Sequence, residues 1–334
     1  MANLNVAVMG GGSWGTTVAS LVTRNAPVRL WARNPATVDE INTQHSNETY
    51  LPGAKLPDKL EATNDIAEAV GGADIVVMGI PSNNFRTVLQ EVKKHIRAWV
   101  PVISLTKGLE LDTGMRMTEI INEVLPGHPV GVLTGPNLAR EIMAGQAAAA
   151  VIAMEDEIIV RELQNVFKSG LFRAYTNTDV IGCELGGVLK NIVAIAVGMG
   201  DGQGAGDNTR SALITRGLAE ITRLGVAMGG RAETFSGLAG MGDMIATCTS
   251  PQSRNRHVGV ELGKGRNIQD IIDEMVMVAE GVKSAPAVMA LSEQYGIEMP
   301  IVRDVYRVLS GDSTVSRAFR GLLRVGVGAE SEPG

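Results

Sequence analysis

The sequence of 334 residues has few aromatic residues, cysteines and histidines. Aromatic side chains make up 4% of the chain, and there are two cysteines and four histidines. Cys183 and Cys248 form no CxxC pair and show no metal-ligand spacing, so we expect both to be reduced and buried. The histidines show no metal spacing and no order typical of a Ser–His–Asp triad, so we expect no metal cofactor.

Positive charge is also scarce. The formal net charge is −6 and the isoelectric point is near 5.4, which argues against a general nucleic-acid-binding protein. An anionic ligand must therefore meet a local basic cluster. The N-terminal sequence MANLNVAVMGGG has no basic segment followed by a long apolar run, so no signal peptide is expected and a cytoplasmic location is favoured.

Apolar residues and glycine are plentiful, at 45% of the chain and 40 residues respectively. A chain of this length and composition suits two domains with large cores. We predict an α/β Rossmann-like domain with a mostly parallel sheet over residues 1–177. An all-helical substrate and catalytic domain is expected over residues 178–326, followed by a disordered tail over residues 327–334.

A glycine-rich turn lies near the N-terminus. The apolar run Leu4–Met9 leads into Gly10-Gly11-Gly12-Ser13-Trp14-Gly15 and then into a helical pattern. Gly10, Gly12 and Gly15 have the spacing that lets a pyrophosphate approach the backbone at the start of a helix. Because a strand precedes the turn and a second strand, Val28–Ala32, follows the helix, the sequence predicts a dinucleotide site.

The end of the second predicted strand bears on the choice of dinucleotide. An acidic residue there would bind the 2′-hydroxyl of NAD, whereas an arginine accommodates the 2′-phosphate of NADP. The chain has Arg33 at this point and no acid. We expect NADP(H) to be accepted; in the alternative, Arg33 only stacks on the adenine and NAD(H) is equally usable.

Later strands alternate with helical segments. The predicted strands are Asp74–Ile80, Val100–Leu105, Val130–Thr134, Ala147–Ala153 and Ala174–Thr176. Ser82, Lys107 and Asn137 each follow the carboxyl end of such a strand, where ligands bind in parallel sheets. All three are expected to face one crevice, although Lys107 alone would also fit an ordinary surface lysine.

The second half has the periodicity of helices throughout. Predicted helices cover Asp179–Met199, Asn208–Ala227, Ile268–Met277, Ala285–Tyr295, Pro300–Leu309 and Val315–Arg324. The stretch Glu184–Gly202 is apolar on nearly every face, which predicts a buried helix. Its charges and glycines argue against a membrane span.

Lys190 and Asn191 interrupt this apolar stretch. No carboxylate lies three or four residues from Lys190, and a buried ammonium without a partner costs several kcal/mol. The partner must come from elsewhere in the chain, which makes Lys190 a candidate functional residue. The alternative is a lysine whose long side chain reaches solvent from the helix surface.

Two further segments carry candidate functional residues. Asp243 and Thr247 share one helix face by their spacing, and Asp243 is the candidate partner of Lys190, unless it is only a first-turn acid stabilised by the helix dipole. Ser253 is a candidate helix cap, and Arg254 and Asn255 follow it in a basic turn that suits an anion, unless this is only a solvated charge run.

Together these motifs resemble the NAD(P)-dependent glycerol-3-phosphate dehydrogenases of the bacterial cytoplasmic type. The likeness extends from Gly10 to about Arg324. It rests on the segments GGGSWGTTVA, NETYLPG, IPSNNFRTVL, SLTKGLE, TGPNLAREI, GGVLKNIVAIAVGMGDG, GLAGMGD and SRNRHVG.

The resemblance implies a role for each matching residue. Lys190 matches the catalytic proton donor and acceptor, and Lys107, Asp243 and Thr247 match residues of the catalytic group. The implied substrate-binding residues are Lys107, Gly135, Asn137, Lys190, Asn191, Asp243, Ser253, Arg254 and Asn255. The implied cofactor contacts are Gly10, Gly12, Ser13, Trp14, Gly15, Arg33, Tyr50, Phe85, Lys107, Ala139, Arg254, Val278 and Glu280. The side-chain role of Asn137 stays open, because many bacterial members have Thr or Ser there.

The implied reaction is the reversible reduction of dihydroxyacetone phosphate to sn-glycerol 3-phosphate by NAD(P)H, which supplies the backbone of glycerophospholipids. The resemblance also implies a homodimer, without nucleic-acid binding or membrane insertion. Two other functions fit the motifs. One is a related Rossmann dehydrogenase acting on a 3-hydroxy acid or on 2-ketopantoate, and the other is a nucleotide-sensing regulator without catalytic activity.

Overall fold

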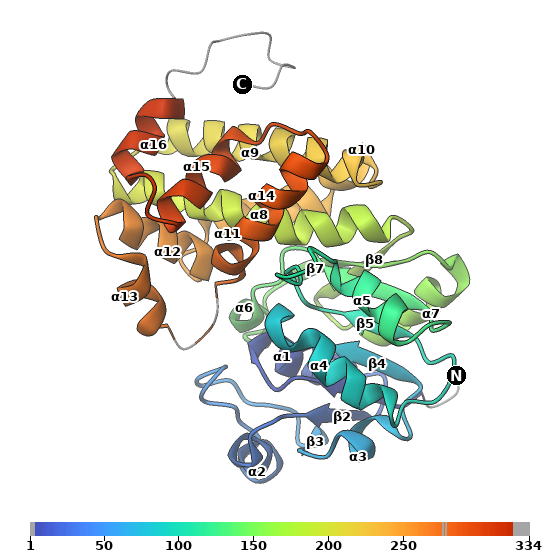
Figure 1. Cartoon of the computed structure of the whole chain (residues 1–334). Helices are drawn as coiled ribbons and strands as arrows, with labels where there is room; N and C mark the ends of the chain where they lie inside the picture. Colours follow the sequence, from blue (N-terminus) through green and yellow to red (C-terminus); the bar gives the residue numbers. More distant parts are fainter. Residues whose placement is uncertain (1–3, 276, 278, 323–334) are drawn as a thin grey trace. The chain divides into compact units, whose positions relative to one another are not determined.

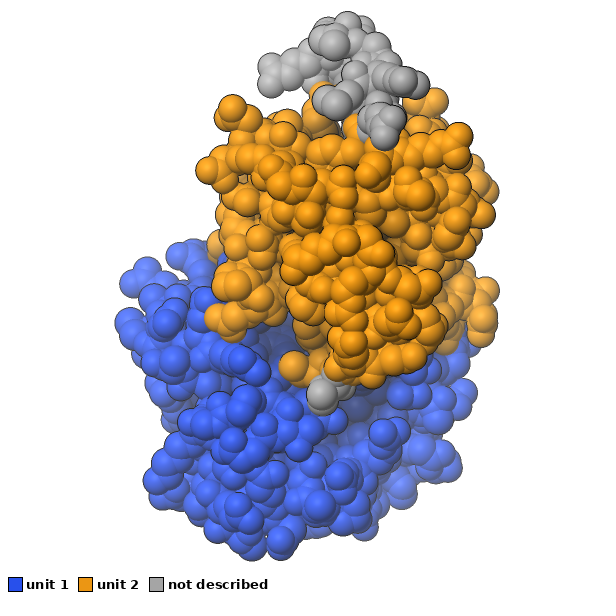
Figure 2. All heavy atoms as spheres, turned by 90° about the vertical axis from the view of Figure 1, so that its left-hand side faces the viewer, with its two compact units in different colours: residues 1–106, 116–180 blue, residues 107–115, 181–334 orange. Residues whose placement is uncertain are grey.

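A computed structural model of the chain describes residues 4–275, 277 and 279–322. By its internal contacts it divides into two units, coloured blue and orange in Figure 2. Unit 1 comprises residues 1–106 and 116–180, and unit 2 comprises residues 107–115 and 181–334. The second boundary lies close to the one expected after residue 177. Residues 107–115, which include Lys107, belong to unit 2 by their contacts, so a single cut does not describe the division.

Unit 1 contains one eight-stranded sheet in the order β3-β2-β1-β4-β5-β6-β7-β8. Neighbouring strands are parallel except for β6 and β7, which are antiparallel. The order from β3 to β6 is that of a dinucleotide-binding sheet. The strands are β1 (Val6–Met9), β2 (Val28–Trp31), β3 (Glu61–Thr63), β4 (Ile75–Met78), β5 (Val102–Ser104), β6 (Val130–Thr134), β7 (Ala148–Met154) and β8 (Phe172–Asn177).

The helices of unit 1 follow the strands. They are α1 (Ser13–Val22), α2 (Pro35–Gln44), α3 (Ile66–Val70), α4 (Ser82–Lys93), α5 (Met117–Val124), α6 (Ala139–Met143) and α7 (Glu157–Phe167). Helix α1 contacts α6 and α7, while α4 contacts α3 and α5. The strands β1 and β4 are buried along their whole length, as expected for a sheet covered on both faces.

Unit 2 is helical, as Figure 1 shows. It contains α8 (Val180–Gly202), α9 (Asp207–Ala227), α10 (Ala232–Phe235), a π-helical turn η1 (Leu238–Gly242), α11 (Asp243–Thr249), α12 (Arg254–Gly263), α13 (Ile268–Asp273), α14 (Glu280–Gln294), α15 (Pro300–Leu309) and α16 (Val315–Leu322). The predicted fold class, a Rossmann-like α/β part followed by an all-helical part, is therefore confirmed.

Helix α8 forms the core of unit 2. By length and composition it could cross a membrane, but 94% of its apolar window is buried inside the protein. Leu189, Ile192, Val193 and Ile195 are fully buried within one cluster that includes side chains of the surrounding helices. The predicted buried helix is thus confirmed, and its apolar surface is explained by packing on all sides.

Several element boundaries differ from the prediction. The three-residue strand β3 was not predicted, because so short a segment carries no clear alternation. Helix α14 begins at Glu280 rather than Ala285 and continues across Pro286. Its first turn is held from outside the helix, since the N–H of Gly281 donates to the side chain of Asn255 at 3.0 Å.

Candidate functional site

The glycine-rich turn in unit 1 has the backbone shape that its sequence predicts. Gly10 has a φ of +122°, and a Cβ there would collide with the carbonyl of Gly79. A Cβ on Gly15 would collide with the carbonyl of Gly10, whereas one on Gly12 would meet nothing within 4 Å. The first and third glycines therefore serve close packing, and the second leaves the backbone open to a ligand.

The start of α1 suits a diphosphate. Gly12 is its N-cap residue, no side chain caps it and no acidic residue lies in its first turn. The unpaired N–H groups and the positive end of the helix dipole then favour an anion. These residues fit the pyrophosphate of a dinucleotide.

Asn47 supports this turn and was not predicted as a site residue. It is fully buried, and its Nδ2 donates to the carbonyl of Gly11 at 2.9 Å and to Oγ1 of Thr16 at 3.0 Å. In the sequence, only its place in the NETYLPG segment indicated a role for Asn47, because its hydrogen-bond partners lie more than thirty residues away. Asn47 fixes the loop on which phosphate binding depends.

The other predicted cofactor residues of unit 1 lie on several elements. Arg33 is exposed directly after β2, with no acid at the strand end. Ser13 and Trp14 open α1, Tyr50 is half-buried in a turn, and Ala139 opens α6. Phe85 is fully buried in α4.

Two predicted substrate residues follow β6. Gly135 has a φ of +116°, which explains why glycine is needed there. Asn137 is half-buried, and both polar atoms of its amide lack a hydrogen-bond partner within the described residues. Buried polar groups are normally satisfied, so this amide is a candidate ligand contact.

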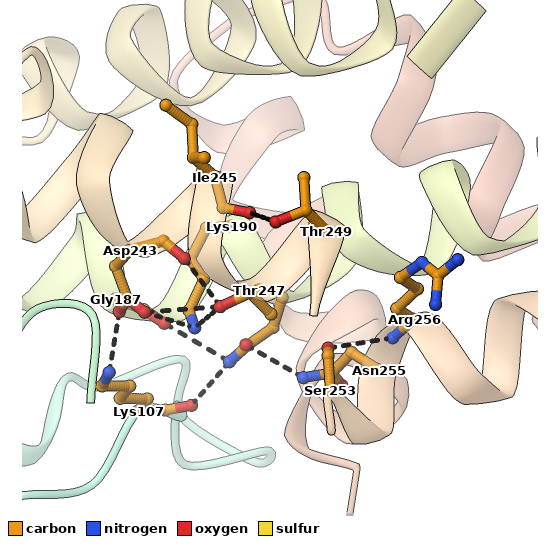
Figure 3. Close-up of polar contacts among 11 residues, drawn as sticks. Lys107, Gly187, Lys190, Asp243, Ile245, Thr247, Thr249, Ser253, Asn255 and Arg256 are labelled. Carbon is orange, nitrogen blue, oxygen red and sulfur yellow. Dashed lines mark hydrogen bonds and ion pairs between the residues drawn. The ribbon is translucent and has the colours of Figure 1, made fainter. Parts of the chain in front are cut away.

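In unit 2, Asp243 binds two lysines at once (Figure 3). Its Oδ1 accepts from Nζ of Lys190 at 2.8 Å, and its Oδ2 accepts from Nζ of Lys107 at 2.7 Å. The side chain of Lys190 is 6% exposed, and that of Lys107 is 19% exposed. Asp243 is therefore the distant partner of Lys190, as predicted. The structure also brings Lys107 to the same carboxylate.

Thr247 completes the group. Nζ of Lys190 donates to Oγ1 of Thr247, whose own hydroxyl donates to the carbonyl of Asp243 at 2.7 Å. Lys190 is thus held by a carboxylate and a hydroxyl on adjacent turns of α11. The spacing of Asp243 and Thr247 does place both on one helix face, as predicted.

The π-helical turn η1 directly precedes Asp243. It packs against α8 at Gly186, where a Cβ would come within 3.0 Å of the carbonyl oxygen of Ala239. A π-turn adds a residue to the helical repeat and is common at functional sites. Close packing at Gly186 lets η1 deliver Asp243 to the lysine that lies one turn further along α8.

Burial and a neighbouring like charge both lower the pKa of Lys190. Desolvation lowers the pKa of Lys190 to about 8; Asp243 opposes this shift and the neighbouring Lys107 adds to it. Its ammonium therefore titrates in the range where a general acid is effective. Burial raises the pKa of the nearby Cys248 thiol to about 12, so this cysteine stays neutral.

Two asparagines connect this group to the basic turn. Nδ2 of Asn191 donates to the carbonyls of Lys107 and Gly187, each at 3.3 Å. Oδ1 of Asn191 accepts from Nδ2 of Asn255 at 2.9 Å, and Oδ1 of Asn255 accepts from the N–H of Gly281. The side chain of Asn255 thus joins α8, α12 and the start of α14.

The basic turn opens α12. Ser253 is its N-cap, and Oγ of Ser253 accepts from the N–H of Arg256 at 3.2 Å, as predicted for a cap. Arg254, at the first helical position, remains accessible to solvent. Partial desolvation by the surrounding chain nevertheless lowers the pKa of Arg254, and the charge of Glu280 opposes this. Val278 lies outside the described residues.

Both halves of the chain match known families. Residues 5–160 match the family model described as NAD-dependent glycerol-3-phosphate dehydrogenase N-terminus. Residues 179–320 match the model described as NAD-dependent glycerol-3-phosphate dehydrogenase C-terminus. The two matches include every predicted catalytic residue. Lys107 lies in the first match, and Lys190, Asp243 and Thr247 lie in the second.

Curated relatives and a solved structure agree with these matches. The chain is 71% identical over 331 residues to glycerol-3-phosphate dehydrogenase (NAD(P)+) 2 of Sphingopyxis alaskensis, covering 99% of each chain. It is 55% identical over 319 residues to glycerol-3-phosphate dehydrogenase (NAD(P)+) 1 of Mycobacterium tuberculosis, covering 95% of this chain and 94% of the relative. The crystal structure of glycerol-3-phosphate dehydrogenase from Coxiella burnetii has a TM-score of 0.92 at 37% identity, covering 96% of this chain and 99% of that one.

Proposed function

Since the chain belongs to the NAD-dependent glycerol-3-phosphate dehydrogenase family, we propose that it catalyses the reversible reduction of dihydroxyacetone phosphate to sn-glycerol 3-phosphate with NAD(P)H. The family expected from the sequence motifs is thereby confirmed. The product is the backbone on which glycerophospholipids are built. Its relatives carry NAD(P)+ in their names, and the glycine turn of unit 1 fits such a dinucleotide.

One observation carries the catalytic assignment. Lys190 is buried in an otherwise apolar helix, bound to Asp243 at 2.8 Å, with Lys107 on the other oxygen of the same carboxylate at 2.7 Å. A purely structural ion pair needs one lysine. Two lysines on one carboxylate leave an excess of positive charge, which suits an anionic substrate and a developing negative charge.

The chemistry follows from this arrangement. When bound, the nicotinamide supplies the hydride that reduces the ketone carbon. Negative charge then develops on the carbonyl oxygen, and Lys190 releases a proton from Nζ to it, which gives the secondary alcohol. In the reverse direction neutral Lys190 accepts the hydroxyl proton. Asp243 and Thr247 hold Nζ in place, and Lys107 stabilises the oxygen or the phosphate by its charge.

Phosphate binding is assigned to the start of α12. Arg254 is exposed there and Ser253 caps the helix, so a guanidinium and a helix N-terminus are both available to an anion. Asn191 and Asn255 are assigned to the same substrate site, with their internal hydrogen bonds fixing its shape. Gly135 and Asn137 are further assigned to the substrate, and the unpaired amide of Asn137 supports this.

Cofactor binding is assigned mainly to unit 1 and catalysis to unit 2. The predicted contacts are Gly10, Gly12, Ser13, Trp14, Gly15, Arg33, Tyr50, Phe85, Ala139, Lys107, Arg254 and Glu280. Because Arg33 is exposed and no acid stands at the end of β2, NADPH is expected to be used at least as well as NADH.

The resemblance also supports a homodimer working in the cytoplasm. The two free, buried cysteines fit a reducing compartment. Sedimentation velocity at micromolar concentration tests the dimer, and a monomer at all concentrations would contradict it. Fractionation of the producing cells tests the location.

The reaction itself is tested by following NADPH oxidation with dihydroxyacetone phosphate. The wild-type protein should turn over, and Lys190→Ala should lose at least about 10³-fold in kcat, within the range for loss of a general acid, while still binding NADPH. Lys264→Ala, which removes an exposed lysine of unit 2, should behave like the wild type. Turnover of 2-ketopantoate but not of dihydroxyacetone phosphate would favour the related dehydrogenase, and NADPH binding without turnover would favour a regulator.

A further inference from the structure

A buried acid at the end of α8 has no part in the proposed reaction. Asp201 follows Lys190 by about three helical turns, so both project from the same side of α8. Its side chain is 9% exposed. A carboxylate this deeply buried is costly unless it is paired and hydrogen-bonded, so its partners indicate its role.

Two arginines saturate the carboxylate of Asp201. Oδ2 accepts from Nε of Arg256 at 2.8 Å and lies 2.6 Å from NH2 of the same residue. Oδ1 accepts from Nε of Arg210 at 3.2 Å and from NH2 at 2.9 Å. Each arginine thus directs two N–H groups to one carboxylate oxygen, and such charge-assisted contacts restrict direction as well as distance. Asp201 therefore orients α9 and α12 relative to α8.

Arg256 is the link to the substrate site. It lies in the first turn of α12, directly after Asn255, and its N–H is bound by the cap Ser253. In Figure 3 its guanidinium points away from Lys190 and Asp243. Of the two arginines in the basic turn, Arg254 remains exposed for an anion, whereas Arg256 is held by Asp201.

Helices α8 and α12 also approach each other closely at two pairs of glycines. The pairs have the same spacing: Gly198 and Gly202 lie on α8, and Gly259 and Gly263 lie on α12. A Cβ at any of the four would come within 3.0 Å of backbone atoms of the other helix. Backbones in such contact are fixed in separation, as in helix pairs joined by small residues.

Glycine faces offer no side chains that interlock. The rotation and register of α12 are therefore fixed by polar contacts beside the glycine faces, together with the apolar packing of Val258 and Leu262 in the core of the unit. At the far end, Nε2 of Gln203 donates to the carbonyl of Gly263. At the near end, the contacts are the Asp201–Arg256 ion pair and the Asn191–Asn255 hydrogen bond. The ion pair is thus the strong contact closest to the basic turn.

We propose that Asp201 is a positioning residue for phosphate recognition. By holding Arg256 it fixes the rotation and register of α12. The turn Ser253–Asn255 then presents Arg254 at a set distance from Lys190, which lies on α8 like Asp201. The inference rests on the proposed function, because the basic turn is taken to bind the substrate phosphate. Asp201 itself touches neither the substrate nor the reacting atoms.

The test compares Asp201→Asn with Asp207→Asn. Asp207 also pairs with Arg210, but its side chain is 90% exposed and it has no contact with Arg256, so it is a matched control. Asp201→Asn should raise the KM for dihydroxyacetone phosphate by about 10-fold or more, as expected for a weakened charged contact. Its kcat should stay within about twofold, because Lys190 and Asp243 are unchanged. Asp207→Asn should match the wild type.

Two probes, a ketone without phosphate and inorganic phosphate alone, separate a positioning role from a general loss of activity. The kcat/KM for dihydroxyacetone, which has no phosphate, should be unchanged in Asp201→Asn, and the affinity for inorganic phosphate, measured by calorimetry, should fall by a similar factor as for the substrate. Asp201→Glu should recover part of the loss. Equal losses on both ketones, or unchanged phosphate affinity, would overturn the proposal.

Two further controls keep the outcome decisive. If Asp201→Asn does not fold, Arg256→Lys serves instead, because lysine keeps the charge but lacks the two N–H groups with which Arg256 contacts Asp201. Its KM for dihydroxyacetone phosphate should also rise, and an unchanged KM would overturn the proposal. A wild-type protein that binds inorganic phosphate but does not reduce dihydroxyacetone phosphate would contradict the proposed reaction alone. The phosphate affinity of the variants would then still decide the role of Asp201.

Discussion

Lys190 and Asp243 form a buried ion pair of 2.8 Å between two helices of the same unit. The pair is unusual because the second oxygen of Asp243 binds another lysine, Lys107. Burial lowers the pKa of Lys190, the carboxylate of Asp243 raises it and the second lysine lowers it further, so that it comes to about 8. The protonation of Lys190 is therefore set by opposing effects, and the charges of Asp243 and Lys107 can be removed separately.

The first prediction concerns the pH dependence of the wild-type enzyme. Reduction needs protonated Lys190, so its kcat/KM should be level below about pH 8 and fall tenfold per unit above it. Oxidation of glycerol 3-phosphate needs the neutral amine and should show the reverse, rising to a plateau above about pH 8. Measurements between pH 7 and 9.5 avoid the phosphate group, which titrates near 6. Reduction and oxidation profiles that both fall, or both rise, as the pH passes about 8 would contradict the assignment.

Asp243→Asn should move the break in the pH profile, which is the pH at which kcat/KM for reduction begins to fall, to a lower value. The substitution keeps the size of the side chain but removes the charge that raises the pKa of Lys190. At pH 7.5 the rate of reduction should fall by at least about tenfold. Breaking a buried pair also destabilises the fold, by about 3–5 kcal/mol, so the melting temperature is measured alongside. A break that stays near pH 8 would mean that Asp243 does not control Lys190.

Lys107→Met should move the break in the opposite direction. Lys107 lowers the pKa of Lys190 by like charge, so its removal should raise that pKa and extend the acidic plateau of reduction above pH 8. The rate at the plateau should also fall, because a positive partner of the substrate is lost. The position of the break, rather than its height, is the readout, and a shift to lower pH would contradict the prediction.

Arg254→Ala should weaken binding of the phosphorylated substrate. Loss of a hydrogen bond to a charged group costs about 1.5–3 kcal/mol, so the KM for dihydroxyacetone phosphate should rise by about 10- to 100-fold. Lys264→Ala removes an exposed cation near the other end of the same helix and serves as the control. An unchanged KM in Arg254→Ala would count against the phosphate assignment.

The parts of the site that could be predicted from sequence are those in which a local pattern conflicts with its surroundings. Lys190 in an apolar helix required a distant partner, and Asp243 was the candidate because it shares a helix face with Thr247 in a glycine-rich segment. The glycine turn was predictable because Gly10 and Gly15 serve local geometry. In each case a few neighbouring residues contain the physical constraint.

The parts that could not be predicted depend on packing between distant segments. Asp201 and Arg256 are far apart in the sequence, and nothing near either residue indicates their pairing. Asn255 was predicted to contact the substrate, but the hydrogen bonds by which its side chain joins Asn191 to Gly281 depend on the packing of α12 and α14 and could not be predicted. The assignment of Lys107 to the helical unit likewise depends on tertiary contacts, since it follows directly after a strand-forming segment.

Glu220 provides a test of stability that is independent of catalysis. It is buried on α9, and its two oxygens accept from the N–H groups of Ile301 at 2.8 Å and Val302 at 3.3 Å, at the start of α15. Burial raises the pKa of Glu220 to about 7, although these hydrogen bonds and the nearby Arg223 oppose the shift. The carboxyl therefore titrates well above its ordinary value of 4.5 in the folded protein.

Between about pH 4.5 and 7 the folded chain then binds more protons at Glu220 than the unfolded chain, so raising the pH across this range lowers the free energy of unfolding. At 1.36 kcal/mol per pKa unit the loss amounts to at most about 3 kcal/mol. Glu220→Gln cannot titrate, so its melting temperature should fall less than that of the wild type between pH 5 and pH 8. Glu298→Gln, an exposed acid close to the start of α15, should keep the wild-type slope. Parallel curves for Glu220→Gln and the wild type would show that Glu220 stays ionised across this pH range.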